Sequence, residues 1–287
     1  MSKPKNHHYV SRCHQKEFFN DSEGRIYIYD KGLDNHYNKQ SSKHLFSEEH
    51  LNTRETNGLI DQVTLETELK ILFEDKFPAH VRQVEKFLTS QDEMQMTYES
   101  LCWLTMLGIL GEMRNPYFKK DIDNVMLKFE SDLITRFYSF PEDKVISTLK
   151  DKQKTPYSNL ASYVDIALKI LEKLEPLDFF IVSIESNDHF ILPDTSCFQL
   201  RGQLRNYPNP FIKEIIQVGV PLTDKLYILA TPQLLKSGMH GIKFERDDYS
   251  DLVYQINRDL YLFSRKAVAC PDENYLKRFI KKVKSGT

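Results

Sequence analysis

The chain has 287 residues, of which 40% are hydrophobic and 28% are charged. This hydrophobic content supplies one large core or two modest ones and excludes a protein that is disordered as a whole. The 39 lysines and arginines against 41 aspartates and glutamates leave a formal net charge of −2. No overall basic field therefore points to nucleic acid, and any such binding must use a local patch.

The four cysteines are scattered and form no CxxC pair, which fits neither a disulfide scaffold nor a four-cysteine zinc site. The first residues carry no apolar run like that of a signal peptide, and no window approaches the ~20 apolar residues that span a bilayer. We therefore expect reduced thiols, a cytoplasmic location and no membrane partner.

Residues 1–58 predict a short strand between polar segments. The stretch "RIYIYDK", from Arg25 to Lys31, is rich in isoleucine and tyrosine and follows the turn-rich "NDSEG", which is typical of a strand after a turn. From Gly32 to Glu55 the sequence is polar and contains three histidines. There we expect a surface loop with short helical pieces.

Helical periodicity begins near Leu59. Apolar residues recur at spacings of three and four and are interrupted at Pro78, which indicates two helices or one kinked helix. Asp92 to Met113 is the most apolar stretch of the chain. It predicts a buried helix that ends before Pro116, because the residue before a proline is pushed out of the helical region.

Two amphipathic segments follow, over residues 118–138 and 158–174, with a lysine-rich connection near residues 151–155. The character then changes. "LDFFIVSIES", residues 177–186, is rich in β-branched and aromatic residues, and "HFILPD" follows only two residues later, which predicts an antiparallel hairpin between them.

"EIIQVGVPLTDKLYILATP", residues 214–232, contains two further strand-like runs joined by a proline turn, and a last helical segment is expected from Asp251 to Lys282. Helices and antiparallel strands that are segregated in this way favour an α+β fold, mainly helical with a small antiparallel sheet, over a doubly wound sheet.

We expect residues 1–287 to form a single compact domain. Its parts are the N-terminal motif with a short strand and polar loop, a helical block, a small antiparallel sheet and a C-terminal helical segment, over residues 1–58, 59–175, 176–235 and 236–287.

"NHHYVSRCHQ", residues 6–15, holds three histidines and an arginine. His7 and His8 are adjacent, so on a strand they face opposite sides, and no HExxH, CxxC or HxxxH spacing supports a zinc site. A histidine beside Arg12 is suited to act as general base or as a hydrogen-bond donor that binds phosphate. The other interpretation is that His7 and His8 only hydrogen-bond the entry to the first helix.

Arg114, in "GEMRNPYFKK", follows the apolar helix. It either complements the helix dipole or forms a rigid anion site, because a planar guanidinium binds phosphate and carboxylate in bidentate fashion. Asp194, in "FILPDTSCF", follows a proline at a predicted strand end. Its carboxylate either hydrogen-bonds its own backbone to form a turn, or is held rigidly by the strand end against a cleft.

Asn257 and Arg265, in "YQINRDLYLFSRK", lie on the last helical segment. They belong to a polar stripe that is either a solvent face or part of a site. The signatures GxGxxG, GxxxxGK and GxSxG are absent from the sequence, which leaves little support for a phosphate-binding glycine loop or a hydrolase nucleophile elbow.

Taken together, "NHHYVSRCHQKEF", "YIYDK", "LGEMRNP", "HFILPDTSCF", "VPLTDKLYIL" and "INRDLYLFSRKAV" resemble, in this order, the family of proteins of unknown function numbered 4238. The resemblance spans most of the chain. It implies a bacterial cytoplasmic protein, in some cases encoded with mobile elements or anti-phage defence genes and suspected of a nuclease-like role. It also implies that the distant polar motifs meet in one site. The matching positions are His7, His8, Arg114, Asp194 and Asn257.

Two hypotheses follow. The first is a nuclease-like or nucleotide-processing effector in anti-phage defence, acting on a phosphodiester or nucleotide, with a divalent metal as the cofactor to test. Its catalytic residues would be His7, His8 and Asp194. Its substrate-binding residues would be Arg12, Arg114, Asn257 and Arg265. The second is a non-catalytic subunit with structural histidines that binds a ligand or a protein partner from a defence operon.

Overall fold

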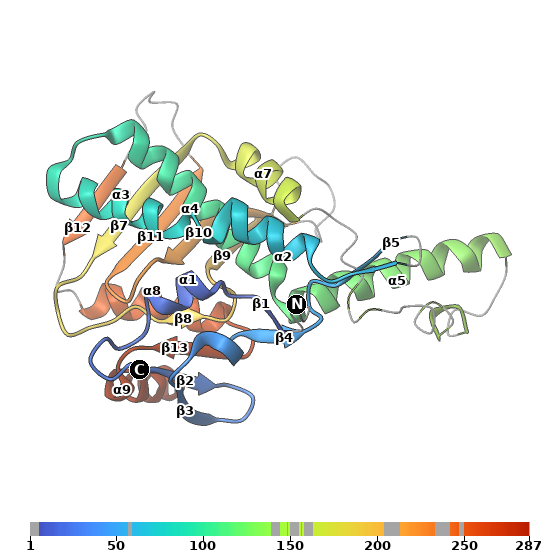
Figure 1. Cartoon of the computed structure of the whole chain (residues 1–287), viewed down its shortest axis with the longest axis horizontal. Helices are drawn as coiled ribbons and strands as arrows, with labels where there is room; N and C mark the ends of the chain where they lie inside the picture. Colours follow the sequence, from blue (N-terminus) through green and yellow to red (C-terminus); the bar gives the residue numbers. More distant parts are fainter. Residues whose placement is uncertain are drawn as a thin grey trace.

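A computed structural model shows two larger sheets, a layer of helices and a projecting arm (Figure 1). The structure describes residues 6–56, 59–138, 144–147, 149, 155, 157, 163–203, 213–232, 242–246 and 250–286. The chain is α+β, as predicted.

The N-terminal part forms short strands where a loop was expected. Its elements are β1 (Asn6–His8), α1 (Arg12–Lys16), β2 (Ile26–Asp30), β3 (Asn35–Lys39), η1 (Ser42–His44), β4 (Ser47–Glu49), β5 (Arg54–Thr56) and β6 (Leu59–Asp61). The strand in "RIYIYDK" is confirmed as β2. The short helical piece expected after it is present as η1, but the expectation that the rest is loop is wrong, because polar β3 pairs with β2 and β4 pairs with β1. Polar edge strands show no apolar alternation, so the sequence does not reveal them.

The helical block is confirmed, with one shifted boundary. Its elements are α2 (Thr64–Leu69), the π-helical η2 (Lys70–Glu74), α3 (Phe77–Ser90), α4 (Met94–Arg114), α5 (Pro116–Tyr138) and α7 (Tyr163–Leu174). Pro78 lies in the first turn of α3, where proline needs no N–H partner, so the chain forms separate helices there. Helix begins at Thr64 and not at Leu59. Residues 158–162 of the last predicted helix lie outside the described residues.

The remaining elements build the sheets. They are β7 (Leu177–Ser183), β8 (Leu192–Pro193), β9 (Phe198–Gln203), β10 (Lys213–Pro221), β11 (Leu226–Pro232), β12 (Ile242–Arg246), α8 (Ser250–Phe263), β13 (Ala267–Cys270) and α9 (Glu273–Ser285). One sheet has the order β12-β7-β11-β10-β9 and the other β3-β2-β13-β8. The β10–β11 hairpin is confirmed, and β12 joins β7 in parallel.

Two predictions for the C-terminal half, one of a hairpin and one of a continuous helical segment, are wrong. β7 does not form a hairpin with the following strand, because β7 is a central strand between β11 and β12, and β8 pairs with β13. Strand β13 interrupts the predicted C-terminal helical segment. All four residues of β13 are buried, and so short an apolar run shows neither the helical nor the strand period.

Alternate side chains of the five-stranded sheet enter two cores. Phe179 and Ile181 of β7 pack with α3, α4 and α7, whereas Val182 packs with α8, α9 and the four-stranded sheet. Figure 1 shows the corresponding layers on the two faces of this sheet. Because successive side chains of a strand point to opposite faces of its sheet, β7 contributes side chains to both cores.

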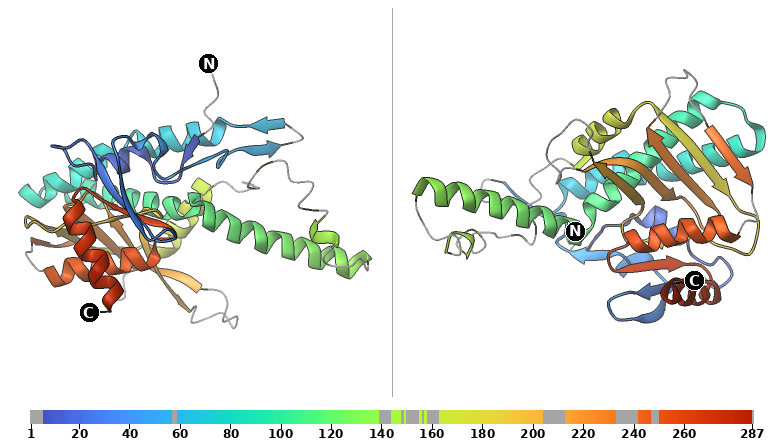
Figure 2. Two further views of the ribbon diagram at one scale, coloured as in Figure 1. Left: turned by 90° about the horizontal axis from the view of Figure 1, so that it is seen from below. Right: turned by 180° about the vertical axis from the view of Figure 1, so that it is seen from behind.

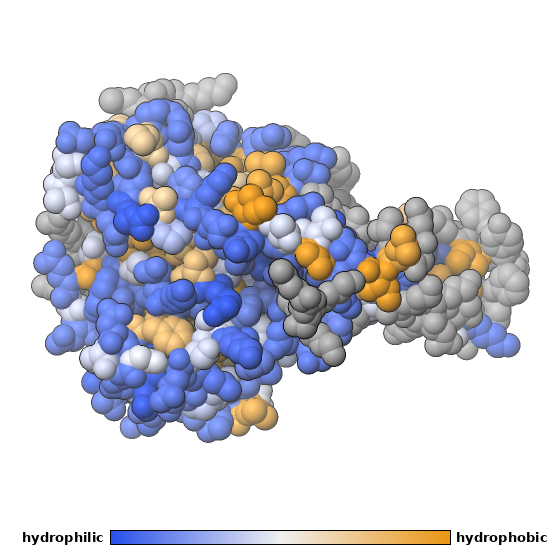
Figure 3. Space-filling model, viewed as in Figure 1, coloured by the Kyte–Doolittle hydropathy of each residue, from blue (hydrophilic) through white to orange (hydrophobic). Residues whose placement is uncertain are grey.

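Helix α5 and the β5–β6 ribbon project from the body (Figure 2). Apolar side chains reach the surface along this arm (Figure 3), among them Leu59, Ile60, Ile122, Val125 and Phe129. Among the described residues, no helix combines the length and apolar character that crossing a membrane requires.

Helix α4 approaches the β8–β9 turn closely because Gly111 has no side chain. A Cβ atom at Gly111 would lie 2.3 Å from the Cβ of Ser196 and 3.0 Å from the carbonyl oxygen of Thr195. Ser196 has a positive φ of 64°, so its backbone is already constrained and yields little. Glycine at this position therefore sets the distance between α4 and the sheet.

We expect Gly111→Ala to lower the free energy of unfolding by about 1–3 kcal/mol, since overpacking outweighs the ~1 kcal/mol that alanine normally gains in a helix. Urea denaturation followed by circular dichroism measures the change. Gly32→Ala is the matched control, because its Cβ would meet only ordinary contact at 3.4 Å. Equal stability of Gly111→Ala and wild type would contradict the close packing.

Candidate functional site

The two adjacent histidines of β1 have different surroundings. His7 is fully buried, and its Nδ1 accepts a hydrogen bond from the backbone N–H of Asn52 at 2.8 Å. His8 is half-buried, and its Nε2 lies 2.9 Å from the carbonyl oxygen of Ser42. Since a carbonyl only accepts, Nε2 carries the proton. Burial is the main cause that lowers the pKa of His8, so its imidazole is neutral at pH 7.

Helix α1 exposes the side chain of Arg12 to solvent and buries that of His14. Arg12 is exposed, and its Nε donates to the Ser42 hydroxyl at 3.2 Å. His14 is buried, with Nε2 2.5 Å from the carbonyl oxygen of Pro221 and its ring against Phe18 and Phe77. Burial lowers the pKa of His14 to about 4. His14 is thus a neutral link from α1 to the end of β10.

Arg114, the last residue of α4, is buried beneath β1. Its guanidinium donates to the backbone carbonyl of His8, and both Nη atoms lie 3.3 Å from Oε1 of Glu74. Its Nε has no hydrogen-bond partner among the described residues. The position favours the helix dipole, as expected, but most of the donors are already used within the protein.

Asp194 is fully buried and bonded to backbone. Its two carboxylate oxygens accept from the N–H groups of Arg265 and Lys266, each at 2.8 Å. Its carbonyl oxygen accepts from Nδ2 of Asn115 at 2.9 Å. Burial raises the pKa of Asp194 to about 6, although the backbone N–H groups act in the opposite direction. This carboxylate therefore ties the β8–β9 turn to the start of β13 and to α4.

Asn257 lies on α8, and Arg265 follows the end of that helix. The Asn257 amide is buried; it accepts from the N–H of Ile191 at 3.0 Å and donates to the carbonyl of His189 at 2.7 Å. The Arg265 side chain is exposed and lies 3.5 Å from Asp121. Asn257 fixes the segment before β8, while Arg265 forms a surface ion pair of little energetic weight.

The structure thus divides the predicted site residues. His8, Arg12 and Arg114 lie together around β1 and η1, linked through Ser42 and the His8 backbone. Asp194 faces the backbone of residues 265 and 266 instead. Its backbone carbonyl is connected to the first group through Asn115, which follows Arg114 in the chain.

A layer of polar residues behind His7 was not predicted. Asn52 binds His7 through its backbone N–H, and its side chain contacts Glu66 and Lys119. Lys119 is buried and donates to the carbonyl of Leu51 at 2.9 Å. Burial, reinforced by Arg114, lowers the pKa of Lys119 well below its usual value. The two lysines after "RNP" were visible in the sequence, but nothing there indicated that one of them is buried.

Metal binding finds no ready ligand set in the described part of the chain. No group of three or more His, Cys, Asp or Glu residues there is placed to hold an ion. The described cysteines are free thiols, and burial raises the pKa of Cys13 and Cys102 to about 11. These thiols are therefore protonated at neutral pH and are poor nucleophiles and ligands.

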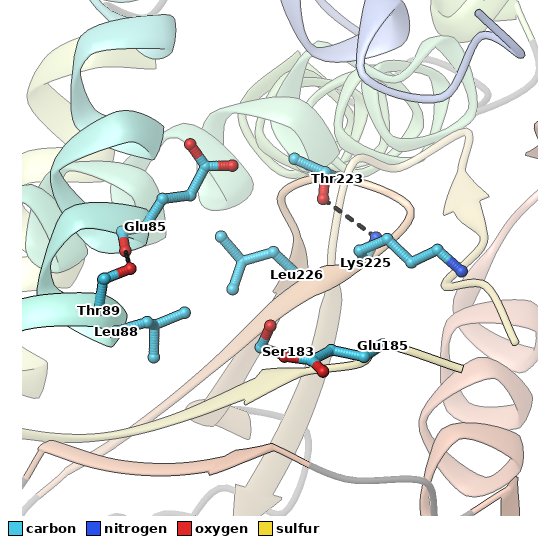
Figure 4. Close-up of a pocket in the computed structure, with 8 residues that line it drawn as sticks. All are labelled: Glu85, Leu88, Thr89, Ser183, Glu185, Thr223, Lys225 and Leu226. Atoms are coloured by element: carbon cyan, nitrogen blue, oxygen red, sulfur yellow. Dashed lines mark hydrogen bonds between the residues drawn. The ribbon is translucent and has the colours of Figure 1, made fainter. Parts of the chain in front are cut away.

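The structure also contains a cavity of about 290 Å³ (Figure 4). It opens between α3, the end of β7 and the β10–β11 turn. Its lining includes Glu85, Glu185 and Lys225, and the Lys225 ammonium is held by the carbonyl oxygens of Ser186 and Asp188. None of the predicted site residues lines it.

The chain belongs to a family of proteins of unknown function, because the model of that family, DUF4238, matches residues 6–273. This confirms the family resemblance. No curated protein and no solved structure matches the chain.

His14 makes stability depend on pH. Its pKa is about 4 in the folded protein against 6.5 in the unfolded chain, so the unfolded chain binds more protons between these values. We expect its contribution, about 3 kcal/mol, to be complete above pH 6.5 and to be lost as the pH falls toward 4. Urea denaturation of wild type and His14→Gln across this range measures it.

Asp194 acts in the opposite direction, since its folded pKa of about 6 exceeds the usual 3.8. Its contribution is complete below pH 3.8 and is lost as the pH rises through 6. Asp194→Asn is therefore the matched control. The wild-type and His14→Gln stability curves should converge on acidification; parallel curves would show that His14 does not titrate as described.

Proposed function

We propose that this chain is a non-catalytic binding or regulatory subunit whose motif histidines are structural. One observation carries the proposal: the polar side chains at the family motif positions form their hydrogen bonds with other groups inside the protein. His7 accepts from Asn52, Arg114 binds Glu74 and a carbonyl group, and Asp194 accepts two backbone N–H groups.

Catalytic groups must reach a substrate, and burial denies this to most of the predicted set. A general base needs a free lone pair within hydrogen-bond reach of the substrate proton. The Asp194 carboxylate is fully buried and already has a donor on each oxygen. A substrate would therefore have to displace backbone contacts that join two sheet elements.

The resemblance to proteins encoded beside defence genes suggests the setting of such a subunit. In that setting the chain would be a bacterial cytoplasmic protein that binds a partner from the same operon. The defence role and the location are part of this proposal.

Substitution at the buried positions should affect stability and not turnover. We expect Asp194→Asn and Arg114→Met each to lower the free energy of unfolding by about 2–4 kcal/mol, because each leaves buried partners unsatisfied. Urea denaturation tests this, with exposed Arg82→Gln as the control. An enzymatic activity abolished by Asp194→Asn at unchanged stability would overturn the proposal.

A second candidate is the nuclease-like or nucleotide-processing activity, now centred on His8. Two observations favour it. His8 is half-buried and neutral, beside exposed Arg12. The buried Nε of Arg114 lacks a partner among the described residues, and a phosphate oxygen would satisfy such a donor. Glu66 and Glu74 nearby oppose it, since their charges act on His8 and repel an anionic substrate.

Purified protein incubated with DNA, RNA and nucleotides, with and without Mg²⁺ or Mn²⁺, tests this candidate. We expect turnover to fall at least 100-fold in His8→Ala if His8 is the base, with thermal unfolding within a few degrees of wild type. Absence of turnover by the wild type under all conditions would refute it.

A further inference from the structure

The C-terminal helix α9 carries a dense basic face. Between residues 277 and 284 five cations are exposed to solvent and no carboxylate intervenes: Lys277, Arg278, Lys281, Lys282 and Lys284. The whole chain has a net charge of −2. Positive charge is therefore concentrated locally on α9, in the kind of patch that binding to an anionic polymer requires of this chain.

Part of this face is neutralised, and part is not. Lys277 pairs with Glu273 at 2.7 Å, and Lys284 pairs with Asp34. Arg278, Lys281 and Lys282 have no carboxylate partner within ion-pair distance in the described part of the chain. Three cations of α9 therefore remain available to an external anion.

The helix is held rigidly by its other side. Tyr275, Leu276, Phe279 and Ile280 of α9 are buried in the core shared with α8 and β13. The Nζ atom of Lys282 lies 4.0 Å from the centre of the Tyr254 ring, a cation–π contact that holds this ammonium at the surface of the helix. Seen from below, α9 lies at the front of the molecule (Figure 2, left).

We propose that this face of α9 binds the phosphodiester backbone of a nucleic acid. The inference rests on the proposed function and names a class of ligand that the binding subunit takes in addition to a protein partner. Packing of the apolar side into the core argues against insertion into a bilayer, which needs that side free. Because cations that contact phosphates read no base edges, we expect this binding to be electrostatic and independent of base sequence.

The family match ends at residue 273, where α9 begins. The basic face thus lies outside the matched residues. It is also separate from the residues around His8, so binding here does not depend on catalysis there.

The number of free cations sets the expected salt dependence. Three phosphate contacts give a slope of log K against log salt of about −2 for single strands and about −3 for duplex DNA. Affinity should therefore fall roughly 20- to 40-fold between 50 and 200 mM NaCl. A dissociation constant of roughly 1 to 100 μM, the range of non-specific binding, is expected.

Fluorescence anisotropy with labelled 20-nucleotide single-stranded RNA, single-stranded DNA and duplex DNA over this salt range tests the proposal. The triple variant Arg278→Gln/Lys281→Gln/Lys282→Gln should weaken binding at 50 mM NaCl at least tenfold and flatten the slope. The control Lys128→Gln/Lys169→Gln/Lys173→Gln removes equal charge from exposed positions on α5 and α7 and should bind like wild type. Circular dichroism confirms that both variants fold.

Several results would overturn the proposal: no binding by the wild type, equal weakening in both triple variants, or equal binding of a poly-glutamate peptide of matched charge. Stronger binding to phosphatidylserine vesicles than to oligonucleotides would also do so. The subunit proposal fails separately, through turnover of the oligonucleotides by the wild type, which leaves binding by α9 intact.

Discussion

The rest of the structure depends on the hydrogen bonds made at the C-terminal turn of α4. There Arg114 reaches up to the backbone of β1 and across to Glu74, and Asn115 reaches the backbone of Asp194. Asn115 also accepts from the N–H of Tyr117, and so ends α4 and begins α5. Three segments far apart in the sequence are thereby fixed at one point, which explains why polar motifs separated by many residues lie close together in space.

Directional hydrogen bonds fix the relative positions of the elements at this junction, which non-directional apolar packing does not do. Each predicted residue here is bonded to backbone, and a backbone group has one position along its strand or turn. Asp194 can accept from residues 265 and 266 only when β13 is in its observed register beside β8. Burial of charge costs free energy, which hydrogen bonds to the charged group offset. These bonds also favour a single arrangement of the elements.

The sequence was sufficient for elements with strong periodicity and insufficient for those defined by their neighbours. The apolar run of α4 and the β10–β11 hairpin could be predicted. Strand β3 is polar because it is an edge, and β13 is four buried residues between two helices. The site is similar: Arg114 was recognisable by its place after an apolar helix, whereas its partner Glu74 depends on how η2 folds back.

Residue type alone also could not distinguish polar residues that stabilise the fold from polar residues that are available to a ligand or partner. Asp194 and His14 are chemically suited to catalysis, yet burial raises the pKa of one and lowers that of the other, and each is bonded to backbone. The lysines of α9 are individually ordinary, yet the helix gathers them on one face because its apolar positions are buried. Surfaces available to a partner are therefore decided by which faces the core leaves uncovered, and these become visible only once the helices and sheets are in place.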